Sequence, residues 1–171
     1  MMIVTHWSAR PLAMPLSVCK QSAPWVPFGK PRGFWVSDEA EYGWSAWCID
    51  NEMSDKRLEF RSEFELMTDR VLLITSADAL DDFNREFGNA KEDTYGRLGV
   101  DWRKVSMAYD GIMITPYRDD RRLVFDWYYG WDCASGCIWR PTECLVRIKA
   151  DRHVAEAECF PAFLASGDDA G

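Results

Sequence analysis

The clearest structural signal in the sequence is Arg57-Leu58-Glu59-Phe60-Arg61-Ser62-Glu63-Phe64-Glu65-Leu66. Its large apolar side chains fall on one parity and its charged side chains on the other. A repeat of two residues is the period of a β-strand, so the pattern predicts a strand with one buried and one exposed face.

Outward from this strand, short apolar segments alternate with polar turns in both directions. Further strands are predicted at residues 3–8, 33–37, 71–75, 123–129, 137–139 and 143–149, with a turn followed by a strand over 109–116. Helices are predicted over 39–51, from Ser76 or Asp78 to Gly88, and over 101–108. The remaining segments are a proline-rich loop at 11–31, a solvated mixed-charge connector at 118–122 and a loop at 130–136.

Strands and helices are mixed along the chain without strict βαβ alternation. This order predicts the α+β class, with a single domain over residues 1–165 built on a mixed, mostly antiparallel sheet and a few short helices. A flexible acidic tail is expected at 166–171.

Composition excludes several function classes. The formal net charge of −8 argues against binding to a nucleic-acid phosphate backbone. No apolar run approaches the length of a membrane-spanning helix, and the N-terminus lacks the pattern of a secretory signal, so we expect no membrane partner. The six cysteines are scattered, which favours reduced thiols in a cytoplasmic protein.

Metal and nucleotide signatures are also missing. Cys133 and Cys137 have the wrong spacing for a zinc knuckle, and His6 and His153 are far from them in sequence, so we expect no metal. The glycines form neither a GxGxxG motif nor a P-loop, and GxSxG is lacking.

The sequence is rich in aromatic residues, with nine Trp among 171 residues. Trp44 and Trp47 lie at helical spacing and are predicted to belong to the core. The run from Trp127 to Trp131 cannot face one way along a strand, so at least two of its rings are expected to be exposed or to line a cleft.

The order of several short segments resembles the NAD-dependent ADP-ribosyltransferase superfamily, in its histidine-tyrosine-glutamate branch. These segments are Thr5-His6-Trp7-Ser8, Gly33-Phe34-Trp35-Val36-Ser37, the helix containing Trp44 and Trp47, Glu63-Phe64-Glu65-Leu66 and Tyr109-Asp110-Gly111-Ile112. The resemblance covers residues 3–149. It implies a domain that binds NAD as a substrate and transfers ADP-ribose to a macromolecular acceptor, such as a protein.

The resemblance also implies roles for particular residues. His6 would hydrogen-bond the nicotinamide ribose, and Trp35, which replaces the tyrosine of the family, would stack on the nicotinamide ring with an N–H in place of a hydroxyl. Ser8 and Ser37 would add hydroxyl groups. Tyr129, in the aromatic run, is a further candidate for cofactor binding.

One carboxylate is required because the reaction passes through a transition state resembling an oxocarbenium ion. Glu143, at the start of a late predicted strand, has the position of the family glutamate, and Asp132 is the rival. If neither faces the pocket, the implied function is NAD binding without transfer.

A different class of function fits the charge. An acidic rim around the aromatic run at 127–131 would suit a non-catalytic, phage-type inhibitor that blocks a host defence component by protein–protein binding. We therefore keep two hypotheses at this point, an NAD-dependent transferase and an acidic interaction protein.

Overall fold

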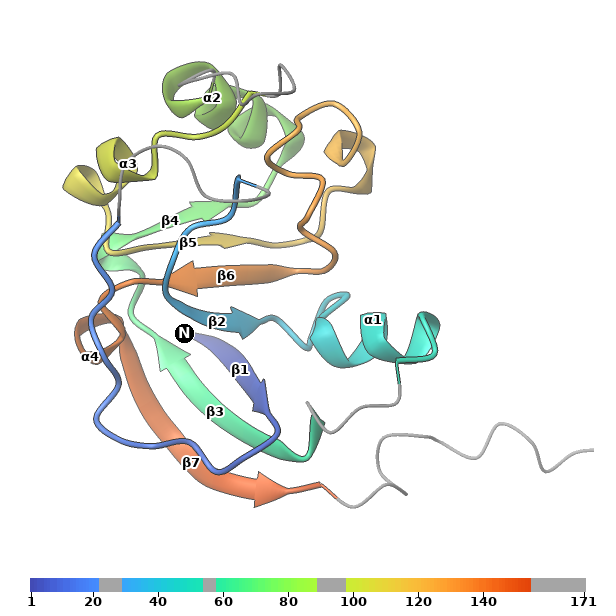
Figure 1. Cartoon of the computed structure of the whole chain (residues 1–171), viewed down its shortest axis with the longest axis vertical. Coiled ribbons are helices and arrows are strands. Elements are labelled where there is room, and N and C mark those ends of the chain that lie inside the picture. The colour runs from blue at the N-terminus through green and yellow to red at the C-terminus, as the bar shows by residue number, and fades with distance from the viewer. Residues whose placement is uncertain (22–28, 54–57, 89–97, 155–171) are drawn as a thin grey trace, which may run out of the picture.

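The computed structural model describes residues 1–21, 29–53, 58–88 and 98–154. In these ranges the chain forms seven strands and four α-helices (Figure 1). The strands are β1 (Met2–Ser8), β2 (Phe34–Ser37), β3 (Phe60–Leu66), β4 (Val71–Ile74), β5 (Gly111–Ile114), β6 (Ser135–Ile138) and β7 (Leu145–His153). The helices are α1 (Trp44–Asp50), α2 (Ala77–Phe87), α3 (Trp102–Ala108) and α4 (Pro141–Cys144). The tail expected at 166–171 lies outside the described residues.

The strands form one sheet in the order β4-β5-β6-β2-β1-β3-β7. β4 and β5 run parallel, and the other pairings among the described strands are antiparallel. The predicted class is therefore confirmed: the chain is a single α+β domain with a mixed, mostly antiparallel sheet.

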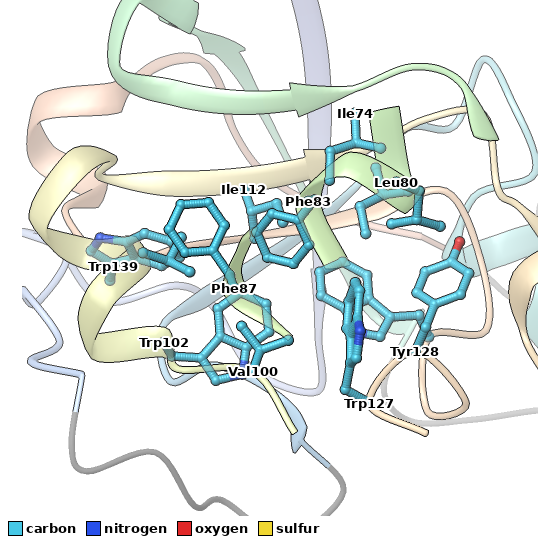
Figure 2. Close-up of a cluster of buried hydrophobic side chains, with 13 residues drawn as sticks. Ile74, Leu80, Phe83, Phe87, Val100, Trp102, Ile112, Trp127, Tyr128 and Trp139 are labelled. Carbon is cyan, nitrogen blue, oxygen red and sulfur yellow. The ribbon is translucent and has the colours of Figure 1, made fainter. Parts of the chain in front are cut away.

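Two hydrophobic clusters lie on opposite faces of this sheet. The successive residues Ile112, Met113 and Ile114 of β5 show the division, because the isoleucines belong to one cluster and the methionine to the other. In the first cluster, α2 and α3 pack their apolar faces against β4 and β5 (Figures 1 and 2). In the second cluster, Leu16 of the proline-rich segment packs against the apolar faces of β1, β2 and β3.

The first cluster is dominated by aromatic side chains, and three of its buried indoles donate hydrogen bonds, whereas Nε1 of Trp131 has no partner within the described residues (Figure 2). The indole of Trp102 donates to the carbonyl of Gly29, that of Trp127 to Asn84 Oδ1 at 2.9 Å, and that of Trp139 to the carbonyl of Tyr109 at 2.8 Å. These hydrogen bonds allow large amphipathic rings to be buried without stranding a donor.

Asp110, which precedes β5, is a buried carboxylate with only 1% of its side chain exposed. It forms ion pairs with Arg70, before β4, and with Arg140, before α4. Its carbonyl also accepts hydrogen bonds from the backbone N–H groups of Trp139 and Arg140, at 3.0 and 3.2 Å. Asp110 thus fixes the start of three elements at one end of the sheet.

Several predictions about the later elements are wrong. Residues 123–129 form turns rather than a strand, with Trp127 and Tyr128 buried side by side in the core. A strand would send two adjacent side chains to opposite faces, whereas a turn allows both to face one core. The segment predicted as a strand over 143–149 begins as α4, because Pro141 occupies the first helical turn.

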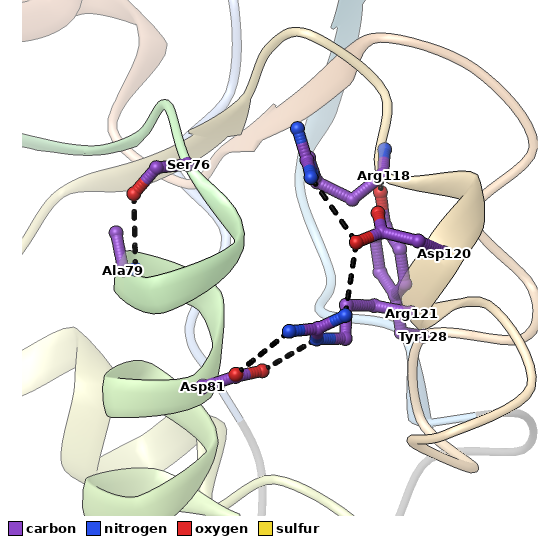
Figure 3. A network of polar contacts seen from close by, with 7 residues as sticks. All are labelled: Ser76, Ala79, Asp81, Arg118, Asp120, Arg121 and Tyr128. Atoms are coloured by element: carbon purple, nitrogen blue, oxygen red, sulfur yellow. Dashed lines mark hydrogen bonds and ion pairs between the residues drawn. The ribbon is translucent and has the colours of Figure 1, made fainter.

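The connector at 118–122 is not a simple solvated turn. Arg121 pairs with both oxygens of Asp81 on α2, at 2.8 and 3.0 Å, and Asp120 bridges Arg118 and Arg121 (Figure 3). The hydroxyl of Tyr128 accepts the backbone N–H of Arg118 at 3.0 Å. This network fastens the long loop between β5 and β6 to α2.

The five cysteines in the described part of the chain are free thiols. No described helix has both the length and the apolar character needed to cross a membrane.

Candidate functional site

A cavity of about 270 Å³ lies against β1, β2, α1 and the segment that leads into β6. Its lining consists of Thr5, His6, Trp7, Ser8, Ala9, Lys30, Trp35, Val36, Ser37, Trp44, Gly130, Trp131, Asp132, Cys133 and Ser135. We call it the β1–β2 cavity. Its volume is near the lower end of the range for small-molecule sites, roughly 300–1,000 Å³.

The cavity lies where β1 and β2 pair over a very short length. β1 pairs with β3 along all seven of its residues, but its ladder with β2 consists of the pair Thr5–Ser37. Side chains from both strands occupy the space that a continuous ladder would close.

His6 is fixed between these two strands. Its Nδ1 lies 2.8 Å from the carbonyl oxygen of Trp35, and its ring stacks on Phe34 with the centroids 4.2 Å apart. A carbonyl can only accept, so Nδ1 carries the proton in this contact, and the neutral tautomer places its acceptor at Nε2.

Four indoles stand around the cavity: Trp7, Trp35, Trp44 and Trp131. Trp35 meets Trp131 edge to face, with centroids 5.0 Å apart, and Trp44 stacks on Trp47 at 4.9 Å. Trp131 is buried, whereas the other three lining indoles are half-buried. Such walls favour flat rings, which stack on the half-buried indole faces.

Glu39, just behind the wall, organises much of this arrangement. Its carboxylate accepts hydrogen bonds from the indole of Trp7 at 3.0 Å and from the hydroxyl groups of Ser37 and Ser45. It also accepts the backbone N–H groups of Trp44 and Ser45, at 3.1 and 3.4 Å, which are the first N–H groups of α1. One anion therefore caps α1 and positions three lining residues.

Ser37, a polar residue just before the predicted helix, is a candidate cap by residue type, but Glu39 takes that role. Ser37 lies inside β2 and donates its hydroxyl hydrogen bond to Glu39 instead of capping the helix. The helix begins at Trp44, later than the predicted 39–51, because Glu39 reaches forward to the N–H groups at that point.

Two charged side chains line the cavity, and they differ in their partners. Asp132 accepts a hydrogen bond from Arg122 at 2.9 Å and has 21% of its side chain exposed. Lys30 forms no ion pair with any residue in the described ranges, and its ammonium lies 5.3 Å from the centroid of the Trp35 ring. Among the described lining residues, Asp132 alone carries a carboxylate.

Cys133 and Ser135 complete the wall next to β6. Burial raises the pKa of the Cys133 thiol to about 12, so it is protonated at neutral pH. Ser135 donates its hydroxyl hydrogen bond to the Cys133 carbonyl at 3.0 Å. The thiol is therefore a packing group rather than a nucleophile.

Five of the seven predicted site residues lie in this cavity: His6, Ser8, Trp35, Ser37 and Asp132. Glu143 does not: it lies on α4, half-exposed, at 3.3 Å from Arg140. The strand register explains the separation, because α4 leads into Leu145, which pairs with Leu66, which pairs with Met2 at the far end of β1 from His6. Figure 1 shows α4 and α1 beyond opposite ends of the strands.

Tyr129 also lies outside the cavity lining. It is 56% exposed, and Arg122 lies 5.4 Å from its ring centroid. The expectation that at least two rings of the aromatic run are exposed or line a cleft is confirmed, since Tyr129 is exposed and Trp131 lines the cavity, whereas Trp127 and Tyr128 are buried in the core.

Sequence reasoning missed several residues of the site. Trp44 was assigned to the core from its helical spacing, although it is half-buried and lines the cavity. Lys30 and Glu39 belong to no motif, so their parts in the site become apparent only from the contacts they make in the folded chain.

No group of three or more potential metal-ligating side chains occurs within the described ranges. Comparison with protein-family models, with curated proteins and with solved structures finds no match.

Proposed function

We propose that this protein is an ADP-ribosyltransferase-like enzyme that binds NAD in the β1–β2 cavity and transfers ADP-ribose to a macromolecular acceptor. One observation carries the proposal: the cavity gathers His6, Ser8, Trp35, Ser37 and Asp132 from three separate segments of the chain. The resemblance of the sequence to that superfamily predicts the same five residues as site residues.

The lining supplies what the reaction requires. The bond between nicotinamide and ribose breaks with its electron pair leaving on nicotinamide, and an acceptor nucleophile then bonds to the ribose carbon. Positive charge develops on the sugar in between, and a carboxylate at this point stabilises it. In the proposal Asp132 is that carboxylate, because the alternative, Glu143, lies on α4 beyond the far end of β1.

The other residues bind and orient the substrate. Trp35 offers a half-buried ring for stacking on nicotinamide, and His6, whose ring is held by the Trp35 carbonyl, contacts the ribose. The hydroxyl of Ser8 donates to the Arg10 carbonyl at 2.7 Å, and that of Ser37 to Glu39, so both oxygens are left to accept from a ligand.

The test is incubation of purified protein with NAD labelled in its adenylate half, together with cell lysate. We expect label on an acceptor, or release of nicotinamide by hydrolysis. Asp132→Asn should lose at least 100-fold in rate, the order of effect of removing one electrostatic stabiliser, roughly 10²–10³. Glu143→Gln is the matched control and should keep wild-type activity.

Two results would overturn the proposal. One is a wild-type protein that neither binds, hydrolyses nor transfers NAD. The other is full activity in both Asp132→Asn and Trp35→Ala, which would place the reaction outside this cavity.

The alternative of an acidic interaction protein stays a prediction, and the burial of most of the aromatic run gives it little support. Its aromatic anchors were to be the rings of residues 127–131, and three of these are packed in the core. We therefore propose no second function.

A further inference from the structure

Lys30 stands out among the charged groups of the β1–β2 cavity. It is half-buried, lines the cavity and has no carboxylate partner in the described part of the chain. The other charged group in the lining, Asp132, is paired with Arg122 at 2.9 Å. In a protein with net charge −8, the charged side chain without an ion-pair partner among the described lining residues is therefore a positive one.

The backbone on both sides of Lys30 is held in place. The carbonyl of Gly29 accepts the indole N–H of Trp102, and the carbonyl of Pro31 accepts the thiol of Cys137 at 3.8 Å. Gly29 has φ of +67°, and a Cβ there would lie 2.8 Å from Cβ of Trp127, so the chain passes tightly over the core.

Farther along the same segment, the side chain of Gln21 bonds to both the backbone N–H and the carbonyl of Arg32. The backbone that carries the Lys30 side chain is therefore held by hydrogen bonds on both sides, unlike that of an ordinary surface lysine. Placing its ammonium against Trp35 costs less side-chain entropy when the backbone is already ordered.

A positioned ammonium that is partly removed from water and lacks a counter-ion is costly to the protein alone and favourable toward an anion. Because the Lys30 ammonium lies beside Trp35, the anion that it binds would belong to the same ligand as the ring that stacks on Trp35. We propose that Lys30 is a phosphate-binding residue and that the cavity takes a phosphorylated nucleoside. This inference rests on the proposed function for the identity of the base, and there the phosphate is that of the nicotinamide mononucleotide half of NAD.

The test compares ligands that differ in the phosphate. Nicotinamide mononucleotide and nicotinamide riboside share the ring and the sugar, and calorimetric titration gives the Kd of each at low and high salt. We expect the mononucleotide to bind about tenfold more tightly, as one charge-assisted contact allows, and the advantage to shrink at high salt.

Variants separate the ammonium from its surroundings. Lys30→Gln should bind the mononucleotide as weakly as wild type binds the riboside, with the riboside Kd unchanged. Lys30→Arg should keep most of the preference. Lys20→Gln makes the same charge change on an exposed residue of the proline-rich segment and should behave as wild type.

The outcomes distinguish this inference from the proposed function. If NAD binds equally to wild type and to Lys30→Gln, the role of Lys30 is refuted while NAD binding stands. If wild type binds no nicotinamide ligand, the proposed function fails, and inorganic pyrophosphate decides the role of Lys30. A rise of the wild-type Tm with pyrophosphate that Lys30→Gln lacks supports a phosphate site, and no rise in wild type overturns it.

Discussion

Replacing Glu39 by Gln removes a charge while preserving the size of the side chain, so it tests whether this carboxylate holds the cavity wall together. One oxygen accepts from Trp7, Ser37 and the N–H of Trp44, and the other accepts both groups of Ser45. A glutamine keeps one accepting oxygen and places an NH₂ where the other stood. The two hydrogen bonds from Ser45 are then lost, and those that remain become neutral.

The expected cost follows from these contacts. Losing the Ser45 bonds and the negative charge at the start of α1 amounts to about 2 kcal/mol, taking roughly 0.5–1 kcal/mol for each bond and about 0.5 kcal/mol for the helix terminus. For a chain of 171 residues this lowers the Tm by about 4–8 °C.

Urea denaturation followed by tryptophan fluorescence measures the free energy of unfolding. Glu41→Gln is the matched control, because Glu41 is exposed and its side chain has no partner within the described ranges, and it should change stability by no more than about 0.5 kcal/mol. A Glu39→Gln protein as stable as the Glu41→Gln control would refute the argument that this carboxylate organises the wall.

Two further predictions concern titration and thiol reactivity. Hydrogen bonds from Arg121 lower the pKa of Asp81 below its usual 3.8, so the stabilisation it provides is present above that pH and is lost as the pH falls through the folded pKa. Asp81→Asn should therefore be less stable than wild type at pH 7 and equally stable at about pH 2, whereas Asp119→Asn, a control at an exposed site, should show no such convergence; a gap that persists in acid would contradict this. For the thiols, burial and a pKa of about 12 predict that iodoacetamide at about pH 8 labels half-exposed Cys19 before Cys133, as peptide mass spectrometry can follow, and rapid native labelling of Cys133 would contradict it.

Local signals in the sequence predicted most of the regular elements. The hydroxyl of Ser76 accepts the N–H of Ala79 at 3.1 Å, and α2 ends before Gly88, as the sequence indicates. Asp101 caps α3 in the same manner, through the N–H of Lys104. Caps of this kind depend on a few neighbouring residues, so they can be predicted from the local sequence.

Elements that depend on distant contacts were predicted less well. Residues 123–129 have the composition of a strand, but Trp127 is held by Asn84, Phe83 and Trp102, which belong to two helices. These contacts outweigh the local preference.

In the candidate site, too, some residues can be predicted from local sequence and others depend on contacts between distant segments. His6 and Trp35 were selected from their own short segments. The choice between Asp132 and Glu143, and the parts of Lys30 and Trp44, follow from how β1, β2 and the long β5–β6 loop meet in space. The spacing of residues along the chain does not predict how these three segments pack together.

The short ladder between β1 and β2 also affects how the molecule responds to force and to a bound ligand. In the strand ladder, one residue pair, Thr5–Ser37, joins β1, β3 and β7 to the four strands on the other side of the sheet. A ligand bound in the cavity would contact strands of both groups and would hold the two groups together. We therefore expect bound ligand to slow amide hydrogen exchange in β7 as well as in β1, which would make exchange at this remote edge strand an indirect reporter of occupancy.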